Sequence, residues 1–179
     1  MKLSERVLTL FIVFCLVFLY LGLSRTTYNT VDISDTIKKV KSTLKENQDL
    51  IIFKSKNPFN FKDIIENLDI VSDQDVYGII TYPDLDKSEY PAIIGVAGSL
   101  GWAEHHLDYL RKYREAGIAT VELYSFKSRN VSSTVGEQVS ATIPMIVYDS
   151  YMLLSSLATN PRIKKESIGI TGWSLGGGV

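Results

Sequence analysis

The sequence is poor in cysteine and histidine, and it carries almost no net charge. Its single cysteine, Cys15, lies inside an N-terminal apolar run, so the remainder has no thiol for a disulfide, a zinc cluster or a nucleophile. A net charge of -1 provides no field that would attract nucleic acid, and we expect no nucleic-acid partner. Because no metal-ligand spacing, phosphate loop or dinucleotide fingerprint is present either, the sequence predicts neither a metal nor a cofactor.

One long apolar run is present, and it lies at the N-terminus. Lys2 and Arg6 precede an uncharged stretch over residues 7–23, a pattern typical of an export signal. Its length fits both a cleaved signal peptide and an uncleaved membrane anchor, because a spanning helix needs about 17 to 25 residues. We therefore expect residues 1–25 to direct export, leaving the domain periplasmic or otherwise outside the cytoplasm, either secreted or anchored in the membrane by residues 7–23.

The remainder divides into a polar segment and a single domain. Residues 26–48 are polar with apolar residues at helical spacing, which predicts a linker containing a short amphipathic helix. Residues 49–179 form the domain, in which the predicted strands are residues 50–53, 76–82, 92–96, 118–123 and 167–171, and the predicted helices are residues 103–115 and 139–158. We expect the first two strands to be antiparallel edge strands and the others to form βαβ units. The fold class is therefore α/β with a mainly parallel sheet.

The last predicted strand is followed by Gly172-Trp173-Ser174-Leu175-Gly176, which matches the G-x-S-x-G nucleophile elbow. In this motif the serine sits on a strained strand-to-helix turn, where side chains two residues before and after it would collide. Gly172 and Gly176 meet that requirement. The pattern predicts Ser174 as a nucleophile and the backbone N–H of Leu175 as one donor of an oxyanion hole. The alternative is that Ser174 is a structural turn serine.

A second oxyanion donor is expected from the loop after the predicted strand at residues 92–96. That loop contains Gly98-Ser99-Leu100-Gly101, and the backbone N–H groups of Ser99 and Leu100 are the candidates. The alternative, equally compatible with the sequence, is that these glycines only form the turn that connects a strand to a helix.

Two residues on a later loop are candidates for holding a substrate. Phe126 and Arg129 follow the predicted strand at residues 118–123, at the carboxyl edge of the sheet, where ligands of α/β proteins bind. We expect Arg129 either to hold a substrate carboxylate or to be a solvated surface arginine.

The segment from Pro91 to Gly178 resembles the dienelactone hydrolase family of α/β-hydrolases, in particular its exported members. The matching features, in chain order, are the loop Gly98–Gly101, the segment Tyr124–Val131, Asp149, the segment Pro161–Ile163, and the elbow Gly172–Gly177. This resemblance implies an α/β-hydrolase fold and a small-molecule ester as substrate. The namesake enzymes carry a cysteine nucleophile, whereas Ser174 places this chain with the serine-bearing relatives, so dienelactone itself is a poor guess at the substrate.

In the α/β-hydrolase fold the catalytic triad runs in the order serine, acid, histidine. Only five residues follow Ser174, so we expect the acid and the histidine to lie beyond Val179, the fold to be truncated after the elbow, and the chain as given to be inactive. His105 and His106 precede Ser174 at the start of a predicted helix, where an exposed or capping role is expected. Asp149 is expected to be a buried or capping polar group.

The expected function is hydrolysis of a carboxylic ester through an acyl-enzyme on Ser174. Two alternatives stay open. A non-catalytic protein with the same fold would use the crevice to bind a ligand. An acyltransferase would use the same elbow to pass the acyl group to an acceptor other than water. A peptidase would use it to cleave an amide bond in place of an ester bond. A downstream aspartate and histidine would favour an enzyme, and their absence would favour the binding protein.

Overall fold

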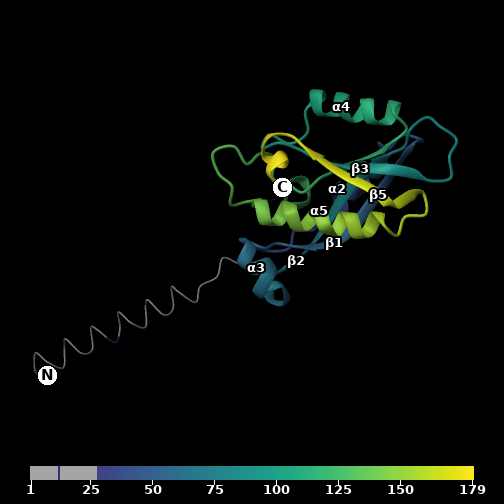
Figure 1. Ribbon diagram of the computed structural model, residues 1–179. Helices are drawn as coiled ribbons and strands as arrows, with labels where there is room; N and C mark the ends of the chain where they lie inside the picture. The colour runs from purple at the N-terminus through teal and green to yellow at the C-terminus, as the bar shows by residue number, and fades with distance from the viewer. Residues whose placement is uncertain (1–11, 13–27) are drawn as a thin grey trace, which may run out of the picture.

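The computed structural model describes residue 12 and residues 28–179 (Figure 1). In chain order its elements, with η denoting a 3₁₀-helix, are α2 (Ser34–Lys41), β1 (Gln48–Lys56), α3 (Phe61–Glu66), η1 (Leu68–Ile70), β2 (Asp73–Thr81), β3 (Tyr90–Val96), α4 (Glu104–Glu115), β4 (Ala119–Leu123), η2 (Lys127–Arg129), α5 (Ile143–Leu157), β5 (Ile163–Gly172) and η3 (Ser174–Gly178). The signal peptide or anchor expected over residues 7–23 lies outside the described residues, apart from Ile12. Within the described part of the chain, no helix has the length and apolar character needed to cross a membrane.

The strands form a five-stranded mixed sheet in the order β1-β2-β4-β3-β5. β3 pairs in parallel with both β4 and β5, whereas β2 pairs antiparallel with both β1 and β4. The α/β class with a parallel portion built from βαβ units is therefore confirmed. The expectation that the first two strands are both edge strands is wrong for β2, because β4 hydrogen-bonds to its inner side.

Helices cover both faces of the parallel portion, with α4 on one face and α5 on the other (Figure 1). The main core contains apolar residues of β3 and β4 together with Ile146, Leu153 and Leu157 of α5. α5 begins at Ile143 rather than at residue 139, because the Thr142 hydroxyl accepts the N–H of Met145 at 3.3 Å as a helix cap.

The segment before β1 packs on the domain. Ile33 and Ile37 of the α2 region are buried against Tyr77 of β2. Gln74 is fully buried, and its amide accepts from the N–H of Val31 and donates to the carbonyl of Val31, both at 2.9 Å. Because side chains alternate along a strand, Tyr77 lies on the face opposite Val76, which belongs to the main core. The short amphipathic helix predicted within residues 26–48 is therefore present as α2, and the segment 31–40 packs on the domain.

Candidate active site

Ser174 lies at the junction between β5 and η3, at the carboxyl end of a parallel strand. Its backbone φ is 51°, in the left-handed region that residues other than glycine rarely adopt. Strain of this kind costs about 1–3 kcal/mol and persists only where the surrounding structure enforces it. The side chain of Ser174 is exposed, so its hydroxyl is open to a substrate.

The two glycines around Ser174 leave no room for a side chain. A Cβ on Gly172 would lie 2.0 Å from the carbonyl oxygen of Gly176, and a Cβ on Gly176 would lie 2.3 Å from the carbonyl oxygen of Val96. Both separations are shorter than any real Cβ contact. A Cβ on Gly177, by contrast, would come no closer than 3.5 Å to another atom. The close packing is therefore specific to the positions two before and two after Ser174.

The loop after β3 lies beside this elbow. Val96 pairs with Gly172 in the parallel register, so both strands leave the sheet at the same edge. A Cβ on Gly98 would lie 3.4 Å from the Cβ of Ser174, which places the loop directly against the serine. The loop closes as a tight turn, in which Gly101 has a φ of 77° and donates its N–H to the carbonyl of Gly98 at 2.8 Å.

The backbone donors that the sequence predicts are free. The N–H groups of Ser99, Leu100 and Leu175 have no hydrogen-bond partner among the described residues. The carbonyl of Ser99 accepts the N–H of Thr134 at 2.9 Å, which anchors the loop. Free N–H groups on the residue that follows an exposed serine and on a loop that packs against it are the kind of donors from which an oxyanion hole is built.

The structure corrects the prediction for Arg129, which is neither solvated nor turned toward a substrate. Its side chain is 4% exposed and forms an ion pair with the fully buried Asp149, with Nη1 to Oδ2 at 2.7 Å and Nη2 to Oδ1 at 3.0 Å. Nε donates to Asn57, and the remaining guanidinium N–H groups donate to the carbonyls of Ser125 and Lys56. All five donors are used, so Arg129 has none left for a ligand.

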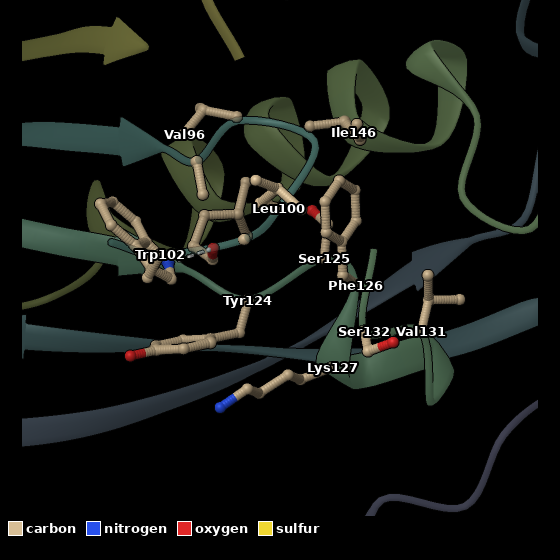
Figure 2. Close-up of a pocket in the computed structure, with 13 residues that line it drawn as sticks. Val96, Leu100, Trp102, Tyr124, Ser125, Phe126, Lys127, Val131, Ser132 and Ile146 are labelled. Atoms are coloured by element: carbon tan, nitrogen blue, oxygen red, sulfur yellow. Dashed lines mark hydrogen bonds between the residues drawn. The ribbon is translucent and has the colours of Figure 1, made fainter. Parts of the chain in front are cut away.

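Phe126, the other residue predicted to contact a substrate, lines a cavity of about 150 Å³ between the loop after β3 and the loop after β4 (Figure 2). The cavity walls are mostly apolar and include Val96, Leu100, Trp102, Leu123, Phe126, Val131 and Ile146. Ser174 does not line it. Ala97 does, and the next residue, Gly98, is the one that lies against Ser174. The cavity is thus adjacent to the elbow.

His106 has the capping role that the sequence suggests. Its Nδ1 accepts the N–H of Ala103 at 3.2 Å at the start of α4. The buried ring stacks on Trp173, with centroids 4.8 Å apart and planes at 28°. Burial lowers the pKa of His106, and the neighbouring His105 lowers it further. A neutral imidazole whose acceptor nitrogen is already occupied is poorly suited to take a proton from Ser174.

Sequence reasoning missed two residues of this region. Trp102 lines the cavity, donates its Nε1–H to the carbonyl of Leu123 at 3.1 Å and lies edge-on to Trp173. Ser125 also lines the cavity, and its buried hydroxyl has no hydrogen-bond partner within the part of the chain that the structure describes. Trp102 belongs to no motif, and its contacts join segments that are distant in sequence. Ser125 lies within the segment Tyr124–Val131, but its burial depends on what packs over it. Across the described residues, no group of three or more His, Cys, Asp or Glu side chains is placed to hold a metal ion.

No protein-family model and no curated protein matches the chain. Solved structures do match. The alpha/beta hydrolase GrgF from Penicillium sp. sh18 aligns with a TM-score of 0.50 and 14% identity over 72% of this chain and 38% of that chain. The chain has an α/β-hydrolase fold. In this fold the turn after β5 and the loop after β3 are where the nucleophile and one oxyanion donor are found.

Two further structures are similar at lower scores. One is a dienelactone hydrolase-like promiscuous phosphotriesterase, P91 from metagenomic libraries, with 9% identity and a TM-score of 0.46 over 73% of this chain and 51% of that chain. The other is Est1E from Butyrivibrio proteoclasticus, with 15% identity and a TM-score of 0.44 over 57% of this chain and 38% of that chain. The chain spans about half or less of the length of the structures it matches.

Proposed function

We propose that the protein is a serine hydrolase that cleaves carboxylic esters, with Ser174 as the nucleophile. The observation that carries the proposal is the left-handed φ of Ser174 between two glycines whose Cβ positions are filled by backbone atoms. A structural turn serine has no need of this arrangement, since the strain destabilises the fold and glycine would relieve it. An exposed hydroxyl that is followed by a free N–H and packed against a loop with further free N–H groups gives the strained turn a role in catalysis.

In the proposed reaction Ser174 Oγ attacks the carbonyl carbon of the ester while a histidine removes its proton. The negative charge that develops on the carbonyl oxygen is held by the N–H of Leu175 and by the N–H of Ser99 or Leu100. Collapse of the tetrahedral intermediate breaks the bond to the alcohol, which takes the proton from the histidine. Water, activated by the same histidine, then releases the acid and restores the serine.

The proposed mechanism needs an acid and a histidine that follow the serine in chain order. No histidine follows Ser174 within these 179 residues, and His106 is engaged at the start of α4. Without a general base the serine hydroxyl is a weak nucleophile. We therefore expect the 179-residue polypeptide by itself to be inactive, and we assign the activity to the product of the complete reading frame.

The test uses that complete product with p-nitrophenyl acetate and p-nitrophenyl butyrate. We expect turnover in the wild type and a loss of about 10⁴-fold or more in the Ser174→Ala variant. Ser99→Ala is the matched control, because it removes a hydroxyl beside the elbow and keeps the backbone N–H. Turnover that is unaffected by Ser174→Ala would refute the proposal and would favour a binding protein.

We also propose that the domain is exported. This rests on Lys2 and Arg6 before the uncharged stretch at residues 7–23. Cell fractionation tests the location, and N-terminal sequencing of the recovered protein distinguishes a cleaved signal peptide from a retained anchor. Recovery of the intact chain from the cytoplasm would contradict the proposal.

A further inference from the structure

The connection between β1 and β2 exposes four large apolar side chains within a short stretch. It contains α3 and η1, and Phe59, Phe61, Ile65 and Ile70 are all exposed, Ile65 to 79%. Phe61 and Ile65 are four positions apart in α3, so they lie on the same face of the helix. Apolar side chains that gather in this way on an exposed segment mark a surface that contacts a membrane or another protein.

The backbone that presents these side chains is well held. α3 begins with a capping box, in which the Asn60 side chain accepts the N–H of Asp63 at 3.0 Å and the Asp63 carboxylate accepts the N–H of Asn60 at 3.3 Å. Just before the helix, the carbonyl of Pro58 accepts the hydroxyl of Thr142 at 2.9 Å. No residue of α3 is buried. The helix is therefore fixed to the domain without covering its own apolar residues.

This connection lies at the edge of the sheet that also carries Ser174. Lys56 at the end of β1 pairs with Asp73 at the start of β2. Because β2 is antiparallel to β4, its start lies at the carboxyl edge of the parallel strands, where the loops after β3, β4 and β5 leave the sheet. Figure 1 shows α3 and the C-terminal end of the chain at the same end of the domain.

The first described residues of the N-terminal part pack against this connection. The ring of Tyr28 stacks on Phe59, with centroids 6.2 Å apart, and its hydroxyl donates to the carbonyl of Val139. Only residues 24–27 separate Tyr28 from the uncharged stretch at residues 7–23. A fully extended chain advances at most about 3.6 Å per residue, so the distance from residue 23 to Tyr28 is at most about 18 Å. An anchor over residues 7–23 therefore keeps α3 beside the membrane surface.

The charges of the connection indicate which part of a membrane it suits. Residues 59–70 carry one basic side chain, Lys62, and three acidic ones, Asp63, Glu66 and Asp69, which gives a net charge of -2. Anionic headgroups repel such a segment. Its affinity for a bilayer must come from apolar side chains that enter the boundary between headgroups and acyl chains, and neutral phospholipid is the matching surface.

We propose that residues 59–70 form a membrane-contacting surface, in which Phe61, Ile65 and Ile70 enter the interface of a bilayer of neutral phospholipid. This contact turns the edge of the sheet that carries Ser174 toward the membrane. The inference rests on the proposed export with residues 7–23 retained as an anchor. It does not depend on ester hydrolysis.

The test measures the surroundings of single labelled positions in the complete protein, reconstituted through its N-terminal segment in phosphatidylcholine vesicles. Ile65→Cys, in a background without other cysteines, carries the environment-sensitive fluorophore nitrobenzoxadiazole. Leu85→Cys is the matched control, because Leu85 is an exposed apolar residue that follows β2 at the opposite edge of the sheet. We expect the emission at position 65 to shift to shorter wavelength and to be quenched by nitroxide-labelled lipids, and the emission at position 85 to show neither effect.

The depth of the contact and the side chains that make it are tested next. Nitroxides near the headgroups should quench position 65 more than nitroxides at the ends of the acyl chains, because an interfacial helix lies only about 5–10 Å deep. With the label at Ile70→Cys, the double substitution Phe61→Ser and Ile65→Ser should reduce quenching by lipid, whereas Leu85→Ser should leave it unchanged. All of these side chains are exposed, so we expect every variant to fold.

Labels at positions 65 and 85 that are equally exposed to water would overturn the inference. A label at position 65 that is shielded from water but not quenched by lipid nitroxides would also overturn it, because a second copy or another part of the chain would then cover α3. N-terminal sequencing that finds residues 7–23 removed would overturn it and leave the proposed ester hydrolysis standing. If lipid contact is found and turnover is unaffected by Ser174→Ala, the proposed hydrolysis fails and the membrane contact stands.

Discussion

Arg129 and Asp149 form a two-point ion pair that is closed off from solvent, with oxygen–nitrogen distances of 2.7 and 3.0 Å. The pair joins the loop after β4 to α5. Ser55 of β1 donates its hydroxyl to Asp149 at 2.5 Å, and Asn57 accepts from Arg129 Nε at 2.8 Å. One charge pair therefore fixes the loop that carries Phe126 to a strand and to a helix, and this makes one wall of the cavity rigid.

We predict that Asp149→Asn strongly destabilises the protein. The substitution keeps the shape of the side chain and leaves the Arg129 charge buried without its counter-charge, which typically costs about 3–5 kcal/mol. Asp108→Asn is the control, since its partner Arg111 is exposed and such pairs contribute at most about 1 kcal/mol. Urea unfolding gives the free energies. Losses of equal size in the two variants would contradict the structural role of the pair.

The second prediction concerns the stability of the elbow, and it compares alanine substitutions at two adjacent glycines. Gly176→Ala would place a Cβ 2.3 Å from the carbonyl oxygen of Val96, which forces the backbone to move and should cost about 3 kcal/mol or more. Gly177→Ala meets nothing closer than 3.5 Å and should change stability by less than about 1 kcal/mol. Thermal unfolding of the two variants makes the comparison. A benign Gly176→Ala would show that the elbow is looser than this structure has it.

Much of this architecture is readable from the sequence, because it depends on local patterns. The β-branched runs, the helical periodicity and the glycines at positions 172 and 176 each act over a few residues, and the α/β class follows from their alternation. The start of β5 was predicted four residues late, at Ser167 instead of Ile163. The charged residues 164–166 are typical of a turn, and the sequence therefore places the start of the strand after them. In the structure they are exposed on an edge strand, where charged side chains are tolerated.

The burial of Arg129 and its ion pair could not be predicted from the sequence. Its partner Asp149 lies 20 positions away, and Asn57 lies 72 positions away. No local pattern shows that a loop, a helix and the end of a strand so far apart in sequence meet. An arginine after a strand has the same sequence context whether it is buried or exposed. The unsatisfied hydroxyl of Ser125 escaped prediction for the same reason, since burial of a serine depends on what packs over it.

The loop after β3 gives a prediction that concerns activity. Gly98→Ala would bring a Cβ to 3.2 Å from the carbonyl oxygen of Trp173 and 3.4 Å from the Cβ of Ser174. We expect the fold to survive and kcat to fall by about tenfold or more, because a shift of the loop displaces the oxyanion donors by a few tenths of an ångström. Steady-state kinetics of the complete protein check this. A change confined to KM would indicate that the loop affects substrate binding and does not stabilise the transition state.

The last prediction concerns pH. Burial lowers the pKa of His106 below its ordinary value of 6.5, so the unfolded chain binds a proton more readily than the folded chain. The contribution of His106 to the free energy of unfolding is therefore complete above pH 6.5 and is lost as the pH falls toward the lowered pKa.

The variant His106→Gln tests this. It keeps an acceptor for the Ala103 N–H, as in a capping box, but cannot titrate. Urea unfolding at pH values of about 7.5 and 5.0 should show a smaller loss of stability on acidification in this variant than in the wild type. His105→Asn, at the exposed neighbouring position, should reduce the loss less than His106→Gln does, because burial is the larger cause of the lowered pKa and His105 the smaller one. Equal losses in all three proteins would show that the protonation of His106 does not contribute to the pH dependence of stability.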